Sequence, residues 1–173
     1  MTKNLSRPQK TEYYLDIAKA VCKRSTCIRR RFGAVIVRDD QIVATGYPGA
    51  PRGAANCIDL GECAREKMHI PSGRNYELCR SVHAEVNAVI NAARAGVSCL
   101  KGTLYLYGEN PDGSLIEGCI PCQMCRRVII NAGIEKVVVR AKEGIDLARQ
   151  QVASLLGCKQ HEIVFTSGGS ESN

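Results

Sequence analysis

The sequence predicts an α/β domain in which a sheet with parallel crossovers is covered by helices on both faces. Segments with apolar residues at every third or fourth position alternate along the chain with short β-branched runs. Two of these runs are joined by only two residues, which predicts a hairpin within the sheet. The 173 residues are 45% hydrophobic and 24% charged, which fits one domain with a sizeable core.

The helices and strands are predicted from the spacing of apolar residues and from the residues at the ends of each element. Residues 11–24 have apolar side chains at helical spacing, and residues 33–47 form the hairpin around Asp39 and Asp40. Residues 48–80 combine Gly, Pro, Asn and Cys without a period, which predicts an inserted loop region. The later elements are a helix over 82–96 ending at Gly96, a strand at 103–108, a turn at 111–114, a helix over 122–131 closed by Gly133, a strand at 135–140, a helix over 148–157 and a strand at 162–168.

The helix over 82–96 carries two residues that its buried face does not require. His83 and Glu85 lie together in its first turn, as a possible metal ligand and a possible acid/base. A histidine at a helix start is usually packed or capped, so this pair needs partners elsewhere in the chain. The face expected to be buried consists of apolar residues at spacings of three and four: Val82, Val86, Val89, Ile90 and Ala93.

Residues 117–127, EGCIPCQMCRR, supply those partners. Pro121 suits the entry to a helix, which places Cys122 and Cys125 on one face of its first turn. Because this end of a helix favours negative charge, both thiols should ionise readily.

Together with His83, the two thiolates make three ligands, and the fourth tetrahedral position stays open for water. That arrangement is typical of catalytic zinc, which lowers the pKa of its bound water to roughly 7. Glu85 is placed to move that water's proton. The alternative is a capped histidine beside an unrelated redox C-x-x-C motif.

H-A-E at 83–85 followed by P-C-x-x-C at 121–125 resembles the signature of the zinc-dependent cytidine deaminase superfamily. The resemblance is closer to the deoxycytidylate deaminases and extends over about residues 11–140. It implies a three-layer α/β/α fold with a central mixed sheet, an oligomer, and conversion of dCMP to dUMP and ammonia. The stretches that carry it lie at 24–27, 32–37, 44–53, 82–90 and 120–139.

The same resemblance implies roles for individual residues. Glu85 accepts the proton of the attacking water and delivers protons to N3 of the base and to the leaving amine. The backbone around Ala84 holds the base edge. Arg52 and the cluster Arg29–Arg31 are candidates for binding the 5′-phosphate, although the cluster is as readily explained as a solvated loop.

One position departs from the family pattern. This chain has Pro48 where the family often has an asparagine that helps to hold the nucleotide. Recognition of the sugar must then differ or move to another residue, and Asn56 is the candidate.

The C-terminal part departs further. Residues from about 145 to 173 resemble a fragment of a cysteine desulfurase, a pyridoxal-phosphate enzyme. No Schiff-base lysine follows, so we do not expect pyridoxal-phosphate chemistry. The expected organisation is a deaminase domain at 1–143 and a helix–strand extension at 144–173 that docks on the same sheet.

Four further cysteines flank the loop region, namely Cys27, Cys57, Cys63 and Cys79, and we call them the peripheral thiols. Some deoxycytidylate deaminases carry a structural zinc here, so the resemblance implies a second, closed zinc site. Because the spacings are irregular, unrelated free cysteines are an equal alternative, and His69 is another possible fourth ligand.

Charge and composition limit the partners. The net charge of +7 suits an anion, either a phosphate-bearing small molecule or a polynucleotide. A nucleic-acid deaminase is therefore an alternative, and the P-C-x-M-C motif also favours it. Against it, two Phe, six Tyr and no Trp leave few aromatic side chains on which the bases of a single strand could stack. A metal-stapled binding module without catalysis is a third possibility. The sequence has no apolar run that spans a bilayer and no secretory h-region, so we expect a cytoplasmic protein without membrane contact.

Overall fold

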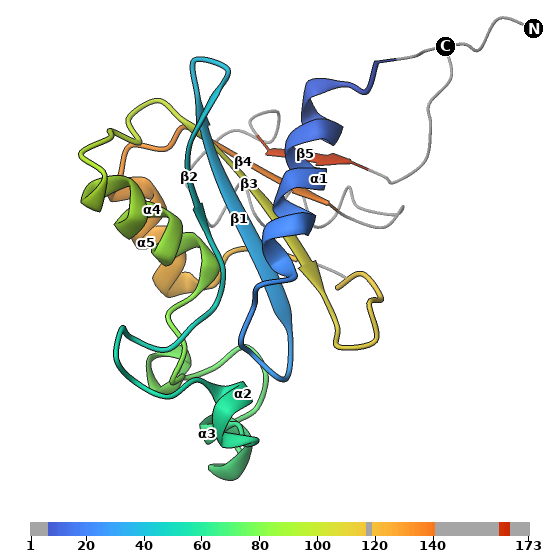
Figure 1. The fold of residues 1–173 in the computed structure, drawn as a ribbon, viewed down its shortest axis with the longest axis vertical. Coiled ribbons are helices and arrows are strands. Elements are labelled where there is room, and N and C mark those ends of the chain that lie inside the picture. The colour runs from blue at the N-terminus through green and yellow to red at the C-terminus, as the bar shows by residue number, and fades with distance from the viewer. Residues whose placement is uncertain (1–6, 117–118, 141–162, 167–173) are drawn as a thin grey trace, which may run out of the picture.

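The computed structural model describes residues 7–116, 119–140 and 163–166. Its centre is a five-stranded sheet with the strand order β2-β1-β3-β4-β5 (Figure 1). β1 runs antiparallel to β2 and β3, whereas β3, β4 and β5 are parallel, so the predicted mixed sheet is confirmed. The strands are β1 (Arg31–Arg38), β2 (Gln41–Gly46), β3 (Thr103–Glu109), β4 (Lys136–Arg140) and β5 (Ile163–Thr166).

Helices cover both faces of this sheet, as predicted. α1 (Lys10–Cys22) packs on one face, and α4 (Ala84–Arg94) and α5 (Gln123–Asn131) lie on the other (Figure 1). Successive side chains of β1 point to opposite faces, so Val35 joins the α1 side and Ile36 joins the α4–α5 side. The result is the three-layer α/β/α architecture.

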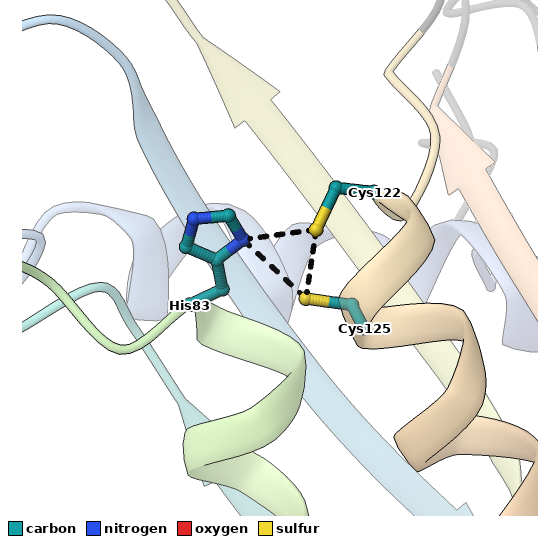
Figure 2. A group of neighbouring side chains, drawn as sticks. All are labelled: His83, Cys122 and Cys125. Atoms are coloured by element: carbon teal, nitrogen blue, oxygen red, sulfur yellow. Dashed lines mark hydrogen bonds between the residues drawn. The ribbon is translucent and has the colours of Figure 1, made fainter. Parts of the chain in front are cut away.

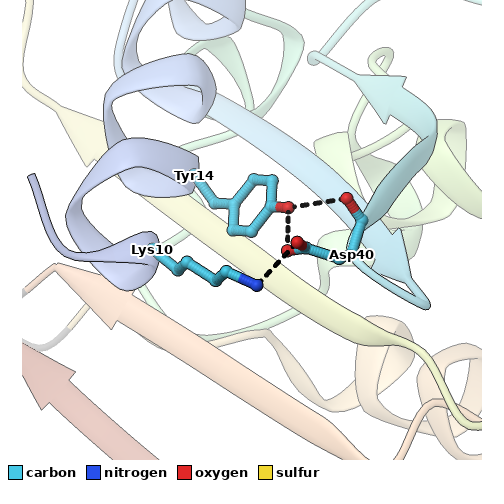
Figure 3. A network of polar contacts seen from close by, with 3 residues as sticks. All are labelled: Lys10, Tyr14 and Asp40. Carbon is cyan, nitrogen blue, oxygen red and sulfur yellow. Dashed lines mark hydrogen bonds and ion pairs between the residues drawn. The ribbon is translucent and has the colours of Figure 1, made fainter. Parts of the chain in front are cut away.

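The β1–β2 hairpin is fixed to α1 by a polar network at its turn. Asp39 and Asp40 both have positive φ, at 50° and 62°, as a two-residue turn between twisted strands requires. The hydroxyl of Tyr14 donates to Asp40 Oδ1 at 2.7 Å, and Lys10 Nζ donates to Asp40 Oδ2 at 2.6 Å (Figure 3). The hydrogen bonds from Lys10 and Tyr14 lower the pKa of Asp40 below its usual range.

The buried face of α4 differs from the predicted one. Ala84, Ala88 and Ala92 are fully buried, whereas Ile90 is 43% exposed. The reason is the close approach of α4 to Gly46 of β2, where a Cβ would lie only 2.2 Å from the Ala84 carbonyl oxygen. Only the smallest side chains fit between the helix and the strand at that distance. Val89 still packs against the edge of the core, whereas Ile90 is exposed.

The region at 48–80 contains short helices that the absence of a period did not predict. They lie at the end of β1 opposite the hairpin turn, at the bottom of Figure 1. Four-residue helices are too short to show a helical repeat, so this part of the prediction was wrong in detail. The elements are α2 (Cys57–Leu60), α3 (Ala64–Lys67) and the 3₁₀ helix η1 (Tyr76–Leu78).

At the far edge of the sheet, β5 falls within the strand predicted at 162–168. It pairs in parallel with β4, with Val137 opposite Ile163 and Arg140 opposite Thr166. The helix predicted at 148–157 lies outside the described residues, and the domain boundary at 143/144 stays a prediction. Among the helices that the structure describes, none is long and apolar enough to cross a membrane.

Candidate active site

The two predicted motifs meet where α4 and α5 begin. His83 is the N-cap of α4 and Cys122 is the N-cap of α5, and both have extended backbone angles before the chain turns into the helix. Cys125 follows within the first turn of α5. Because α4 and α5 pack side by side on one face of the sheet, the three side chains point toward one another across the gap between the helix starts (Figure 2).

The distances between the donor atoms fit a single zinc ion. His83 Nδ1 lies 3.3 Å from Cys122 Sγ and 3.4 Å from Cys125 Sγ, and the two sulfurs are 3.4 Å apart. Tetrahedral zinc bonds to such donors imply separations of about 3.5–3.8 Å, so adjustments of a few tenths of an ångström suffice. Within the described ranges, this is the one group of three His, Cys, Asp or Glu residues whose ligand atoms all lie within 4.8 Å.

Mutual hydrogen bonding polarises these three side chains. The Cys125 thiol, and then His83, lower the pKa of Cys122, while Cys122 and burial raise the pKa of Cys125. Burial works against a charged His83, but hydrogen bonds with Cys122 and Cys79 raise its pKa to about 10. Zinc needs two thiolates and a neutral imidazole, so its binding releases protons from Cys125 and His83.

Glu85 lies in the first turn of α4, two residues after His83, and is only 5% exposed. Burial raises the pKa of its carboxyl group, against the opposing influence of the positive charge on His83. A raised pKa brings a carboxyl group closer to neutral pH, where it can both accept and donate a proton.

These residues line a cavity of about 510 Å³, a volume typical of small-molecule sites. Apolar side chains, including Phe32 and Ile116, form part of its wall. The other notable feature is positive charge, which suits an anionic ligand. The arginines of the lining are Arg29, Arg30, Arg65 and Arg126.

Comparisons with known proteins agree with this site. The sequence model of the family described as the cytidine and deoxycytidylate deaminase zinc-binding region matches residues 8–141. The chain belongs to this deaminase family. It is 35% identical to deoxycytidylate deaminase of Schizosaccharomyces pombe over 88% of this chain and 42% of that protein. It is 38% identical to deoxycytidylate deaminase of Mycobacterium phage D29 over 78% of this chain and 96% of that protein.

The solved structures include relatives of the same fold. The dCMP deaminase of cyanophage S-TIM5, in apo form, superposes with a TM-score of 0.59 at 26% identity, covering 93% of this chain and 100% of that one. The chain spans less than half of the two yeast relatives, 42% for Schizosaccharomyces pombe and 47% for Saccharomyces cerevisiae.

Of the residues predicted to contact the substrate, some line the cavity and others do not. Ala84 and Arg29 line the deaminase cavity, and Arg29 also pairs with Glu66 at 2.8 Å. Arg52 is exposed and does not line the cavity. Asn56 does not line it either, because its side chain is the N-cap of α2 and accepts hydrogen bonds from Thr26 and Ala50 through Oδ1.

The peripheral thiols lie near one another without forming a compact ligand set. Burial, offset in part by a hydrogen bond with Ser81, raises the pKa of Cys57, and the charges of the other three peripheral thiols raise it further. No three of the four, however, have their sulfurs within 4.8 Å of one another. His69, the alternative ligand, is exposed.

Sequence reasoning missed three residues that line the cavity. Arg126 donates from Nε to the Pro121 carbonyl at 2.8 Å and so fixes the entry to α5. Arg65 and Tyr76 come from the insertion, where no period marks them. The chain has 24 Lys and Arg residues, and nothing in the sequence marks Arg65 and Arg126 among them as lining a cavity.

Proposed function

We propose that this protein hydrolyses dCMP to dUMP and ammonia with one catalytic zinc ion. The observation that carries the proposal is the convergence of His83, Cys122 and Cys125 beside the buried carboxyl group of Glu85 in one cavity. The family match and the relatives named deoxycytidylate deaminase support the same reaction.

The donor set fits zinc rather than a harder cation. Two thiolates and one imidazole are soft and borderline ligands, which zinc prefers over magnesium or calcium. His83, Cys122 and Cys125 would hold the ion, and three protein ligands leave one position for water. When bound there, zinc supplies a water molecule whose pKa is lowered to roughly 7.

Glu85 performs the proton transfers in this proposal. Its carboxylate accepts one proton of the attacking water and gives it to N3 of the base as the new C4–oxygen bond forms. It then accepts the second proton, from the hydroxyl now on C4, and gives it to the amine, which leaves as ammonia while the C4 carbonyl forms. Burial keeps bulk water away from the carboxyl group, so each proton that it accepts passes to the base and not to the solvent. The backbone at Ala84 holds the edge of the base at the same helix start.

The positive side of the cavity binds the 5′-phosphate. Arg29 and Arg30 line the cavity within the basic cluster, and an arginine fork matches phosphate oxygens. Pro48 also lines the cavity and offers no side-chain donor, so the sugar is held without the amide that the family often uses there.

A second zinc ion, held by the peripheral thiols, is a separate proposal. Its support is the gathering of four thiols around one weakly packed insertion, close enough for three of them to shift the pKa of Cys57. A closed four-sulfur site would have to draw these thiols together as zinc binds.

Assembly and location belong to the same proposal. Exposed apolar side chains on α4 and α5 support a homo-oligomer, because burying them against a second copy removes them from water. The free thiols support a cytoplasmic location, where cysteines stay reduced. The exposed side chains are Ile90, Met124 and Ile130.

The deciding experiment incubates the zinc-loaded protein with dCMP, CMP, cytidine and a cytosine-containing oligonucleotide, and follows the release of ammonia. We expect the highest kcat/KM with dCMP. Turnover of the oligonucleotide or of cytidine in preference to dCMP would contradict the proposed substrate. No ammonia from any of the four would favour a binding module without catalysis.

A further inference from the structure

Arg65 is a charged side chain buried inside the insertion. It lies in the short helix α3 and is only 5% exposed, whereas its neighbours Glu66 and Lys67 are exposed. Burying a guanidinium group is costly unless other groups replace its hydration. The groups that surround Arg65 therefore indicate what the insertion is built around.

Two carbonyl groups and one aromatic ring surround this guanidinium. Arg65 Nη2 donates to the Pro71 carbonyl at 3.0 Å and also to the Arg74 carbonyl. The central carbon of the guanidinium lies 4.3 Å from the centroid of the Tyr76 ring, which is within cation–π distance. Residues 71–76 thus fold around the Arg65 side chain, and their conformation depends on it.

The Tyr76 ring in turn contacts His83. The two ring centroids are 5.3 Å apart and the rings are inclined at 81°, an edge-to-face arrangement. Arg65, Tyr76 and His83 therefore form a continuous series of contacts that leads from the insertion to the start of α4. All three side chains line the cavity of the candidate active site.

We propose that Arg65 and Tyr76 are positioning residues that hold the imidazole of His83 in its metal-binding orientation. The proposal rests on the proposed role of His83 as a zinc ligand. The second torsion of a histidine side chain is broad and roughly two-fold, so the ring has a flipped orientation available. In the flipped ring, Nδ1 no longer faces Cys122 and Cys125.

The Tyr76 ring restricts that flip because it packs against one side of the imidazole. The Arg65 guanidinium keeps Tyr76 in place through the cation–π contact and through its hydrogen bonds to the Pro71 and Arg74 carbonyls, which hold the segment that carries Tyr76. Groups that orient a ligand histidine typically contribute about 10–100-fold to metal affinity or activity. The insertion would then have a function in metal binding that does not need a second zinc ion. Its Cys79 contacts the same imidazole through a hydrogen bond, so Tyr76 is not alone in holding the ring.

The test uses four variants of the full chain and two controls. Tyr76→Leu removes the ring, whereas Tyr76→Phe keeps it. Arg65→Met removes the charge, whereas Arg65→Lys keeps the charge but lacks the planar guanidinium that lies against the Tyr76 ring. Tyr13→Leu, at a half-exposed tyrosine of α1, and Arg94→Met, at an exposed arginine of α4, are the matched controls.

Zinc affinity is measured by competition with a chromophoric chelator, and the ligand environment by the visible spectrum of the cobalt-substituted protein. We expect Tyr76→Leu and Arg65→Met to weaken zinc binding by about 10–100-fold and to alter the cobalt spectrum. Tyr76→Phe restores both properties, Arg65→Lys lies between, and the controls match the wild type.

Wild-type zinc affinity and an unchanged cobalt spectrum in Tyr76→Leu would overturn the proposal. If that variant does not fold, Arg65→Lys decides, because an unchanged affinity and spectrum there would also contradict the role of the planar guanidinium. A wild-type protein whose cobalt spectrum lacks thiolate charge-transfer bands would instead contradict the zinc site itself. The two failures are therefore distinguishable.

Discussion

The helix starts and the insertion both carry cysteines, but they position them differently. Cys122 and Cys125 lie in the first turn of α5, a nine-residue helix that packs on the sheet. The peripheral thiols come from loops and from helices of four residues. The sulfurs of the first region lie 3.4 Å apart and within reach of an imidazole, whereas no three sulfurs of the second region come within 4.8 Å.

This difference shows what rigid elements contribute to a metal site. A long helix packed on a sheet fixes the direction of side chains in its first turn, so the donors converge before any metal binds. Hydrogen bonds with Cys125, and then with His83, lower the pKa of Cys122, so the convergence of the donors itself favours a thiolate. In the insertion, burial raises the pKa of Cys57, whereas the hydrogen bond with His83 lowers the pKa of Cys79.

The largest effect is expected from Cys125→Ser in the preorganised group. Serine keeps the size of the side chain but replaces a soft thiolate with a hydroxyl that does not ionise, so the site loses a zinc ligand. We expect loss of the catalytic zinc and of measurable deamination, with the circular dichroism spectrum unchanged. Elemental analysis and an ammonia assay measure these effects, and retained activity in the variant would remove Cys125 from the zinc site.

The next largest effect separates the acid/base from the ligands. Glu85→Gln keeps the shape of the side chain but cannot take a proton, so we expect kcat to fall by about 10²–10⁴-fold. The zinc content should stay at the wild-type value, since Glu85 is not among the three donors. Near wild-type turnover in this variant would show that another group moves the proton.

Cys57→Ser tests the second region. If the peripheral thiols hold zinc, wild-type protein contains about two zinc ions per chain and the variant contains one. The melting temperature of the variant should then fall by more than the roughly 2–4 °C that corresponds to 1 kcal/mol in a domain of this size. One zinc per chain in the wild type would eliminate this site, and only the thiols at the helix start would then bind metal.

The smallest effect is expected at the hairpin turn, at the end of β1 away from both thiol regions. Because the pKa of Asp40 is lowered in the folded protein, its contribution to stability is present above the usual carboxyl range and is lost as the pH falls through the folded pKa. Asp40→Asn should remove that pH dependence and leave the zinc content unchanged. Thermal unfolding between pH 3 and pH 7 measures it, and a loss of zinc would show that the hairpin end is coupled to the site.

The sequence predicted the parts of the molecule that depend on local patterns. The helix starts at His83 and Cys122 were predictable because ligand residues stand directly before apolar helices. The hairpin was predictable because two residues at its turn join two β-branched runs.

Contacts between distant segments were not predictable in the same way. The buried face of α4 is decided by Gly46, which lies 38 positions before Ala84 and shows no sign of that contact in its own neighbourhood. Arg65 and Tyr76 meet His83 through a segment without a period. Asn56 was expected in the substrate site, yet its side chain is used to cap α2, an interaction visible only once that short helix is known.

The central claim is that the catalytic zinc has two sulfur ligands and an open position. X-ray absorption at the zinc edge of the zinc-loaded Cys57→Ser protein tests it most directly, because that substitution removes one peripheral thiol and leaves His83, Cys122 and Cys125 intact. The expected coordination is two sulfurs at about 2.3 Å and two nitrogen or oxygen atoms at about 2.0–2.1 Å. Four sulfur ligands, or none, would contradict the claim.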